Sequence, residues 1–302
     1  MAQDLPTAVL GRTCLEVTRL GFGAMDVHSD PGPRALSDER ASAVLNQVLD
    51  SGINFIDTSI DYGASEEFIG KFISHRRSEF YLASKCGCSV LPEAIAEGGH
   101  VYSRENLIAG VNQSLTRMKT DYLDIVQLHI SPSRDTLDKH GAIDTLRDLQ
   151  KEGKIRFIGS SSILPNIEEH INMGVFDQFQ VPYSALQRQH EEVITRATGV
   201  GAGTVIRGGV ASGEPGVSGT FRSDAWPKFD MVKLDELRED GESRTAFLLR
   251  FTLSHPNVHT TIVGTQNLDH LHENVQAAIK GALPADVYRE AKLRLDSTNR
   301  WT

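Results

Sequence analysis

Residues 103–129 read SRENLIAGVNQSLTRMKTDYLDIVQLH and contain, in succession, the two patterns from which the fold can be predicted. Ser103 is a typical helix N-cap, and the apolar residues after it recur at the spacing of one helix face. These apolar residues are Leu107, Ile108, Val111, Leu115 and Met118. Residues 122–129 then form a short apolar run, typical of a strand buried on both faces. The stretch therefore predicts one helix followed by one strand.

This unit recurs along the chain, from a helix that begins after Ser37 and stops at Gly52 to a last predicted helix at 268–281. Strands that alternate with helices form parallel sheets with right-handed crossovers. The predicted strands are 18–25, 53–57, 80–84, 122–129, 155–161, 176–181, 204–208 and 259–265. Eight such units match the α/β class and the (β/α)8 TIM barrel of about 250 residues. A doubly wound open sheet is the main alternative.

Two further features complete the predicted architecture. Residues 8–17 are expected to form an N-terminal β-hairpin before the barrel. No linker rich in Pro, Gly or Ser divides the sequence, so we expect residues 1–302 to form one domain.

Composition restricts the classes of partner. Lys and Arg number 31 against 40 Asp and Glu, so the formal net charge is −9, which argues against nucleic acid or an anionic membrane. No run of about 18 apolar residues and no secretory signal is present. The cysteines, Cys14, Cys86 and Cys88, are too few for a disulfide framework. We therefore expect a cytoplasmic protein in a reducing compartment.

Polar residues stand where predicted strands end, beginning with Asp57 in the stretch NFIDTSIDYG (54–63). Tyr62 follows in the next loop, Lys85 ends a second strand and His129 ends a third. Each residue alone has an ordinary explanation, such as a turn former or a packed ring. In a TIM barrel, however, the carboxyl ends of the strands share one rim, where active sites lie. We therefore expect these four side chains to converge.

The four groups together have a coherent chemistry. A free phenol has a pKa near 10, and a neighbouring ammonium lowers it. Lys85 would thus make Tyr62 a better proton donor, while Asp57 keeps Lys85 charged. His129 would orient a substrate oxygen. Such a set can protonate a carbonyl oxygen while hydride reaches the carbon.

These residues resemble the aldo-keto reductase family. The resemblance extends over nearly the whole chain, including 19–25, 52–73, 81–85, 103–129, 146–161 and 253–275. It implies that Asp57, Tyr62, Lys85 and His129 are a catalytic tetrad. It also implies a nicotinamide cofactor, NADP(H) as first choice with NAD(H) possible, bound across the barrel without a Rossmann domain. The glycine-rich run 199–203 agrees, since it precedes a strand and lacks the last glycine of the dinucleotide fingerprint.

The resemblance also implies residues for the nicotinamide half of the cofactor. Arg207 stands where the family usually has a stacking aromatic, and its planar guanidinium is expected to lie against the nicotinamide. A salt bridge to a neighbouring loop is the alternative. Ser162 replaces the usual Asn of the carboxamide site. The full implied set is Gly23, Ala24, Met25, Asp57, Ser161, Ser162, Gln180 and Arg207, followed by Val210, Ala211 and Gly213 at the pyrophosphate.

The adenosine half is implied at residues 264–274. Thr265 and the following helix N-terminus suit a 2′-phosphate. Gln266 and His270 stand where relatives often carry basic or amide groups, which leaves NAD(H) possible. A simple capped surface helix is the alternative. The implied residues are Gly264, Thr265, Gln266, His270, Glu273 and Asn274.

Two other features bear on the site. Cys86 and Cys88 flank a glycine, but no Cys or His pair with metal-site spacing accompanies them, so we predict no metal site and place both in the pocket wall. Loops 87–102 and 212–241 are expected to shape the substrate site. The aromatic residues of the second loop, Phe221, Trp226 and Phe229, would either line an apolar pocket or pack within the loop.

The sequence therefore predicts an NAD(P)H-dependent reductase of aldehydes or ketones, which also oxidises alcohols in reverse. The small-molecule substrate is a carbonyl compound or an alcohol. A nicotinamide-binding regulatory subunit with little turnover, like the potassium-channel β-subunits of the family, is the main alternative. An unrelated barrel lyase or phosphate-binding enzyme is a third hypothesis.

Overall fold

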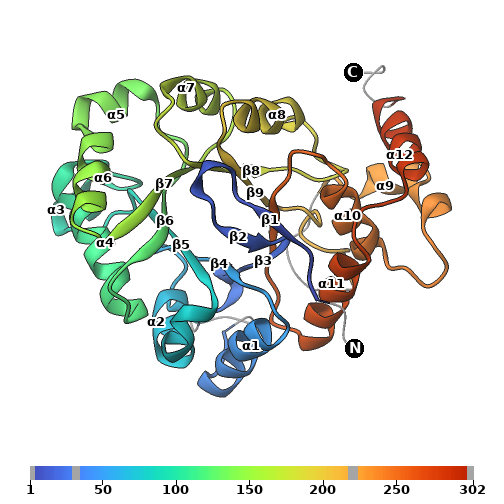
Figure 1. The fold of residues 1–302 in the computed structure, drawn as a ribbon, viewed down its shortest axis with the longest axis horizontal. Coiled ribbons are helices and arrows are strands. Elements are labelled where there is room, and N and C mark those ends of the chain that lie inside the picture. Colours follow the sequence, from blue (N-terminus) through green and yellow to red (C-terminus); the bar gives the residue numbers. More distant parts are fainter. Residues whose placement is uncertain (1–3, 29–34, 217–223, 298–302) are drawn as a thin grey trace.

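The computed structural model describes residues 4–28, 35–216 and 224–297. Eight parallel strands close into a barrel surrounded by helices (Figure 1), which confirms the predicted TIM barrel. In barrel order the strands are β10 (Thr260–Val263), β3 (Leu20–Gly23), β4 (Phe55–Asp57), β5 (Tyr81–Cys86), β6 (Leu123–Leu128), β7 (Ile155–Ser161), β8 (Gln178–Pro182) and β9 (Gly203–Arg207). The predicted hairpin is also present, as antiparallel β1 (Thr7–Val9) and β2 (Glu16–Thr18).

Helices connect successive strands. Ser37 and Ser103 cap their helices as predicted, each accepting a hydrogen bond from the backbone N–H three residues later. The α-helices are α1 (Asp38–Asp50), α2 (Ser65–Phe72), α3 (Pro92–Glu97), α4 (Arg104–Met118), α5 (Arg134–His140), α6 (Ala142–Lys151), α7 (Asn166–Met173), α8 (Glu191–Gly199), α9 (Pro227–Met231), α10 (Arg244–Leu253), α11 (Leu268–Lys280) and α12 (Ala285–Ser297). Short 3-10 turns are η1 (Gly11–Thr13), η2 (Ala24–Asp26), η3 (Ser74–Glu79) and η4 (Leu234–Leu237).

Some element boundaries differ from the prediction. β5 ends one residue beyond Lys85, and β6 ends one residue before His129. The helix expected to be the last, α11, is followed by α12. Helix α12 buries only Ala291 and Leu295, so its apolar stripe is too narrow to be recognised from periodicity.

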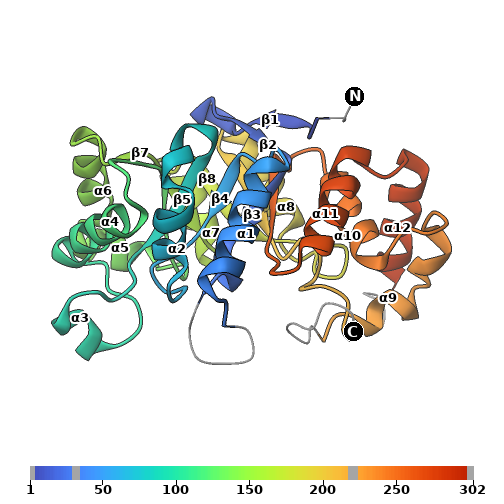
Figure 2. The ribbon, with the colours of Figure 1, turned by 90° about the horizontal axis from the view of Figure 1, so that it is seen from below.

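The hairpin closes the amino-terminal end of the barrel (Figure 2). Leu10, Leu15 and Val17 pack there against residues that point into the barrel, and we call the whole set the plug cluster. It consists of Leu10, Leu15, Val17, Phe55, Ala83, Ile125 and Val205, all at most 3% exposed. This end of the barrel interior is therefore apolar and closed.

Two residues further along the same strands, the interior becomes polar. Because side chains alternate along a strand, residues two apart share a face. Phe55, Ala83, Ile125 and Val205 are thus followed on the inner face by Asp57, Lys85, Gln127 and Arg207, which we call the rim layer. Gly159 leaves room for this layer, because a Cβ there would lie 2.9 Å from Cγ of Gln127.

Within the described residues, no helix is both long enough and apolar enough to cross a membrane.

Candidate active site

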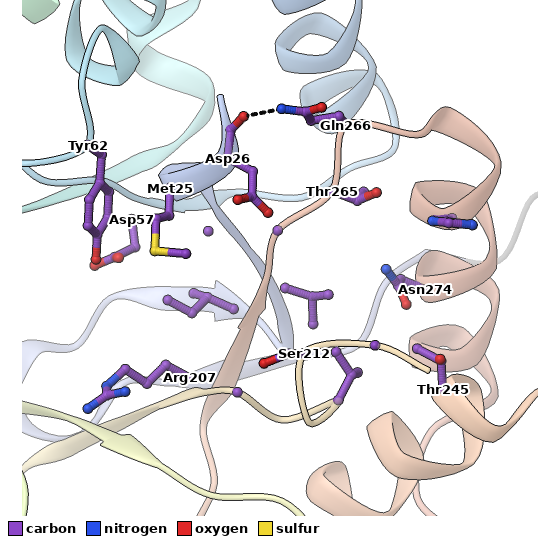
Figure 3. A pocket seen from close by; sticks show the side chains of 18 of the residues that line it. Met25, Asp26, Asp57, Tyr62, Arg207, Ser212, Thr245, Thr265, Gln266 and Asn274 are labelled. Carbon is purple, nitrogen blue, oxygen red and sulfur yellow. Dashed lines mark hydrogen bonds between the residues drawn. The ribbon is translucent and has the colours of Figure 1, made fainter. Parts of the chain in front are cut away.

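A cavity of ≈ 1030 Å³ opens at the carboxyl ends of the strands, opposite the hairpin. Its lining includes the last residues of five strands, Gly23, Asp57, Ser161, Arg207 and Val263. In Figure 3, Tyr62 and Arg207 lie toward one end of the cavity, while Asn274 and Thr245 lie toward the other. The volume is at the upper end of the roughly 300–1,000 Å³ typical of small-molecule sites.

Asp57 and Lys85 form a buried ion pair at the base of this cavity. Nζ of Lys85 donates to Oδ2 of Asp57 at 2.7 Å and to the carbonyl of Thr58 at 2.7 Å. Both side chains are no more than 2% exposed. Burial alone would lower the pKa of Lys85, but the Asp57 carboxylate and the Tyr62 phenol reverse this and raise it. Lys85 is therefore a cation at neutral pH.

The second oxygen of Asp57 is held by two amides. Nε2 of Gln127 donates to Oδ1 at 2.7 Å, and Nε2 of Gln180 donates to the same atom at 2.9 Å. Oε1 of Gln180 accepts from the Ser161 hydroxyl at 3.1 Å. Lys85 and the two amides together hold both oxygens of Asp57 in place. Gln127 was not predicted; its only sequence signal is an amide in the mostly apolar strand LDIVQL.

Tyr62 lies directly beside the lysine. Nζ of Lys85 is 4.7 Å from the centroid of the Tyr62 ring, so the two groups share one site as predicted. Burial raises the pKa of Tyr62, and the positive charge of Lys85 opposes this rise without cancelling it. Tyr62 is therefore protonated at neutral pH, as a proton donor must be.

His129 completes the group. Its ring meets that of Tyr62 edge-on, with centroids 6.2 Å apart, and lines the cavity. Burial lowers the pKa of His129 even though Asp61 raises it, so the neutral imidazole is favoured. Oδ2 of Asp61 is 3.5 Å from Nδ1 of His129 and 3.1 Å from Nε2 of His100. The structure thus brings all four predicted tetrad residues together.

Most residues implied for the nicotinamide and pyrophosphate line the cavity, but three do not. Gly23, Met25, Ser161, Gln180, Arg207, Val210 and Gly213 belong to the lining. The hydroxyl of Ser162 instead lies 2.9 Å from Nδ1 of His170, in a buried network with Ser160. Ala24 is fully buried, and the carbonyl of Ala211 accepts a hydrogen bond from Trp226. These three residues are therefore not part of the cavity lining.

The adenosine end of the cavity is built around the start of α11. All six residues implied there, from Gly264 to Asn274, belong to the lining. Arg40 of α1 lines it too, and its guanidinium donates through Nε at 3.2 Å and Nη2 at 2.9 Å to the carbonyl of Gln266. Nε2 of Gln266 donates in turn to the carbonyl of Asp26 (Figure 3). Arg40 thus brings a cation to Gln266, which sequence alone did not reveal because the two are 226 positions apart.

The cavity wall beside His129 is apolar, but the predicted aromatics do not form it. Trp226 and Phe229 are buried, and they stack on each other within their loop. Phe221 lies outside the described residues, and Cys86 and Cys88 are buried outside the lining. Instead Ile130 and Ile163, 61% and 43% exposed, line the cavity.

Ile130 also has an unusual backbone. Its φ of 60° lies in the left-handed region, where a β-branched residue is strained. Such outliers cluster at functional sites, and this one directly follows His129.

The residues present fit a nicotinamide dinucleotide. In Figure 3, Asp57 and Tyr62 lie at one end of the cavity and Asn274 at the other, and the lining also includes Arg40 and the residues at the start of α11. A carboxamide needs both a hydrogen-bond donor and an acceptor. The amide of Gln180 has one N–H and one acceptor lone pair beyond its bonds to Asp57 and Ser161, and the Ser161 hydroxyl can also accept. The residues at the two ends of the cavity therefore suit a ligand with an anionic group at one end and a polar ring at the other.

Comparisons with known proteins agree with this geometry. The model of the aldo/keto reductase family matches residues 19–292. The uncharacterized oxidoreductase YqkF of Bacillus subtilis is 30% identical over 285 residues, covering 89% of this chain and 90% of its own. L-galactose dehydrogenase of Arabidopsis thaliana is 27% identical over 285 residues, covering 89% of this chain and 86% of its own.

A solved structure of the same family has the same fold. The holo form of aldo-keto reductase AKR11C1 from Bacillus halodurans superposes with a TM-score of 0.82 at 28% identity, covering 96% of each chain. The barrel, the converging tetrad and these similarities lead to one conclusion. The chain belongs to the aldo/keto reductase family and is an NAD(P)H-dependent oxidoreductase.

Proposed function

We propose that the protein reduces the carbonyl group of a small aldehyde or ketone, with Tyr62 as the proton donor, and oxidises the corresponding alcohol in reverse. The observation that carries this proposal is the contact of the protonated Tyr62 with the buried Lys85–Asp57 pair. When bound, the nicotinamide supplies the hydride that reaches the carbonyl carbon. The side chains of this chain supply the proton and the geometry.

The roles follow from position. Tyr62 gives its proton to the carbonyl oxygen as negative charge develops there, and the ammonium of Lys85 stabilises the resulting phenolate. Asp57, held by Gln127 and Gln180, keeps Lys85 charged and fixed. His129 is neutral and donates a hydrogen bond from Nε2 to the substrate oxygen. Ile130 and Ile163 give the substrate an apolar wall, which favours carbonyl compounds with an apolar substituent.

We infer that NADP(H) is the preferred cofactor. Gly264, Thr265, Gln266 and His270 would hold the 2′-phosphate with the amino end of α11, and Glu273 and Asn274 would contact the adenine. Arg40 adds the cation that Gln266 itself lacks. Arginine carries five N–H donors, and the two that bind Gln266 leave others for a phosphate. Arg207, which lines the cavity, would lie against the nicotinamide. We also infer a cytoplasmic location, where three free cysteines stay reduced.

A paired kinetic comparison tests the activity. Wild-type protein is assayed with NADPH and with NADH on a panel of aldehydes and ketones, and cofactor binding is followed by protein fluorescence. Turnover on apolar carbonyls with cofactor binding supports the proposal. Tight cofactor binding without turnover on the whole panel would favour a regulatory subunit instead. Absence of binding by either cofactor would point to another class of barrel enzyme.

Arg40→Ala tests the cofactor preference. A hydrogen bond to a charged group is worth roughly 1.5–3 kcal/mol, so we expect kcat/KM for NADPH to fall by about 10–150-fold. The kcat/KM for NADH should stay the same. Arg147→Ala, an exposed change on α6 beside Asp144, is the matched control. An equal loss with both cofactors in Arg40→Ala would reject a role in phosphate recognition.

A further inference from the structure

Four potential metal ligands lie together beside the tetrad, and they come from separate parts of the chain. They are the carboxylate of Asp61, the thiol of Cys88 and the imidazoles of His100 and His129. Their ligand atoms all lie within 4.8 Å of one another. Asp61 precedes Tyr62, Cys88 and His100 flank α3, and His129 follows β6. Since no two of them have the spacing of a sequence motif, the pattern was not visible in the sequence.

The Asp61 carboxylate can accept hydrogen bonds from His100, His129 and Cys88, but these bonds leave the ring nitrogens of His100 and His129 in close contact with each other. Nδ1 of His129 lies 3.1 Å from Nε2 of His100, 3.5 Å from Oδ2 of Asp61 and 3.4 Å from Sγ of Cys88. A single ring nitrogen carries either one hydrogen or one lone pair, so it cannot satisfy three partners. Oδ2 of Asp61 likewise lies 3.1 Å from Nε2 of His100. One ion at the centre would give every one of these atoms a partner.

The separations match those of a tetrahedral metal site. Zinc–ligand bonds of about 2.0–2.3 Å place neighbouring ligand atoms roughly 3.3–3.6 Å apart. Four of the six separations among Asp61, Cys88, His100 and His129 lie between 3.1 and 3.5 Å, within about 0.2 Å of this range, and all six are within 4.8 Å. The ligand set of one thiolate, two imidazoles and one carboxylate suits Zn²⁺ and related transition metals, whereas Mg²⁺ and Ca²⁺ require oxygen ligands.

The surrounding backbone holds these ligands in place. Cys88 and His100 face each other across an antiparallel β-bridge. Nδ2 of Asn106 donates to the carbonyl of Cys88 at 3.0 Å, and the Tyr102 hydroxyl donates to the carbonyl of His129. The side chain of Cys88 is almost completely buried, and those of His100 and His129 are only 16% and 12% exposed. Three of the four ligands are thus largely shielded from water, and Asp61, whose side chain is 38% exposed, faces the solvent.

We propose that Asp61, Cys88, His100 and His129 form a four-ligand site for a divalent cation of the zinc class. Binding forms a bond from the metal to each ligand and releases the thiol proton of Cys88 to solvent. A site closed by four protein ligands has a structural role, which here is to tie the loop around α3 to the strand end that carries His129. Ligation at Nδ1 also fixes the proton of His129 on Nε2, where a substrate oxygen would need it.

Metal titration of the full chain tests this site without reference to turnover. Protein freed of metal with a chelator is titrated with Zn²⁺ and, separately, with Co²⁺. We expect one tightly bound ion per chain, a higher Tm with Zn²⁺, and for Co²⁺ the intense visible bands of a tetrahedral thiolate complex. A chain that binds neither ion stoichiometrically, or binds Co²⁺ without a thiolate band, overturns the proposal.

Single substitutions locate the site. Changes in the outer shell of a metal site cost roughly 10–100-fold in affinity, so losing a ligand in Cys88→Ser or His100→Ala should cost more than this. Cys14→Ser and His75→Ala, at exposed positions, are the matched controls and should bind Zn²⁺ like the wild type. Near-ultraviolet circular dichroism checks that each variant is folded. Folded variants of Cys88 and His100 that keep wild-type affinity would place the ion elsewhere and contradict the proposal.

Discussion

The two ends of the barrel are built from the same strands, yet their interiors have opposite chemistry. At the amino end, the plug cluster fills the barrel with apolar side chains under the hairpin. At the carboxyl end, the rim layer holds the Lys85–Asp57 ion pair and the amide of Gln127. In β4, β5, β6 and β9 the two layers are only two residues apart. One strand can therefore serve stability at one end and chemistry at the other.

The comparison also shows why the polar end needs its partners. A buried carboxylate without compensation is costly, and Asp57 receives one ammonium and two amide N–H groups. Changes at the rim layer should therefore affect activity first, and changes in the plug cluster should affect only stability. The following predictions test this separation.

Lys85→Met should have the largest effect. The substitution keeps a long side chain but removes the charge that supports Tyr62, so we expect kcat to fall by about 10²–10⁴-fold. It also leaves Asp57 without its cation, which should lower the free energy of unfolding by roughly 3–5 kcal/mol. Steady-state kinetics and urea denaturation measure the two effects.

Two further variants separate activity from stability at this position. Lys151→Met, at an exposed site on α6, should change neither quantity. The double variant Asp57→Asn/Lys85→Met should regain stability, because the unpaired carboxylate is gone, but no activity. Recovery of turnover in the double variant would contradict the assigned role of the lysine charge.

Leu15→Ala, in the plug cluster, should have the opposite signature. Truncating a buried leucine leaves a cavity, so we expect the free energy of unfolding to fall by about 2–5 kcal/mol. The value of kcat should stay at the wild-type level at temperatures where the variant is folded. A parallel loss of kcat in the folded variant would show that the two ends are not independent.

Asp177→Asn should have the smallest effect, and its sign depends on pH. Asp177 precedes β8 at the amino end, and its carboxylate accepts from the backbone N–H of Ile158 at 3.0 Å. Burial raises the pKa of Asp177, with Arg12 and the Ile158 hydrogen bond only partly opposing it. Its ionisation therefore weakens the fold as pH rises through the native pKa.

The amide of Asn keeps the acceptor and avoids this cost. Asp177→Asn should therefore raise Tm at pH 7, and the difference should vanish as the pH falls toward the unfolded-state pKa of about 3.9. Melting curves at several pH values measure it. A variant that is destabilised at pH 7 but not in acid would show that the charge of Asp177 supports the amino end.

The sequence predicted the barrel because each strand and helix is a local pattern, bounded by caps such as Ser37 and Ser103. It predicted the tetrad because strand ends in a parallel barrel share one rim, so order along the chain implies proximity. Residues whose role depends on distant partners were missed. Gln127 is significant only through its bond to Asp57, and Arg40 only through Gln266.

Side-chain packing was the other reason why some sequence predictions differ from the structure. Ser162 and Ala211 lie outside the lining; the hydroxyl of Ser162 binds His170 instead, and Ala211 is buried. Trp226 and Phe229 lie in a loop beside the site but are buried in the main hydrophobic core, where Phe229 contacts Phe247 of α10. Periodicity and order cannot supply such information, because it depends on which neighbours compete for each side chain.

The most direct test of the central claim is a single-turnover measurement on Tyr62→Phe. The variant is loaded with saturating NADPH and mixed with a carbonyl compound that the wild type reduces, and NADPH oxidation is followed. If Tyr62 gives the proton, the rate should fall by about 10²–10⁴-fold while NADPH affinity stays the same. A variant that oxidises NADPH at the wild-type rate would contradict the account.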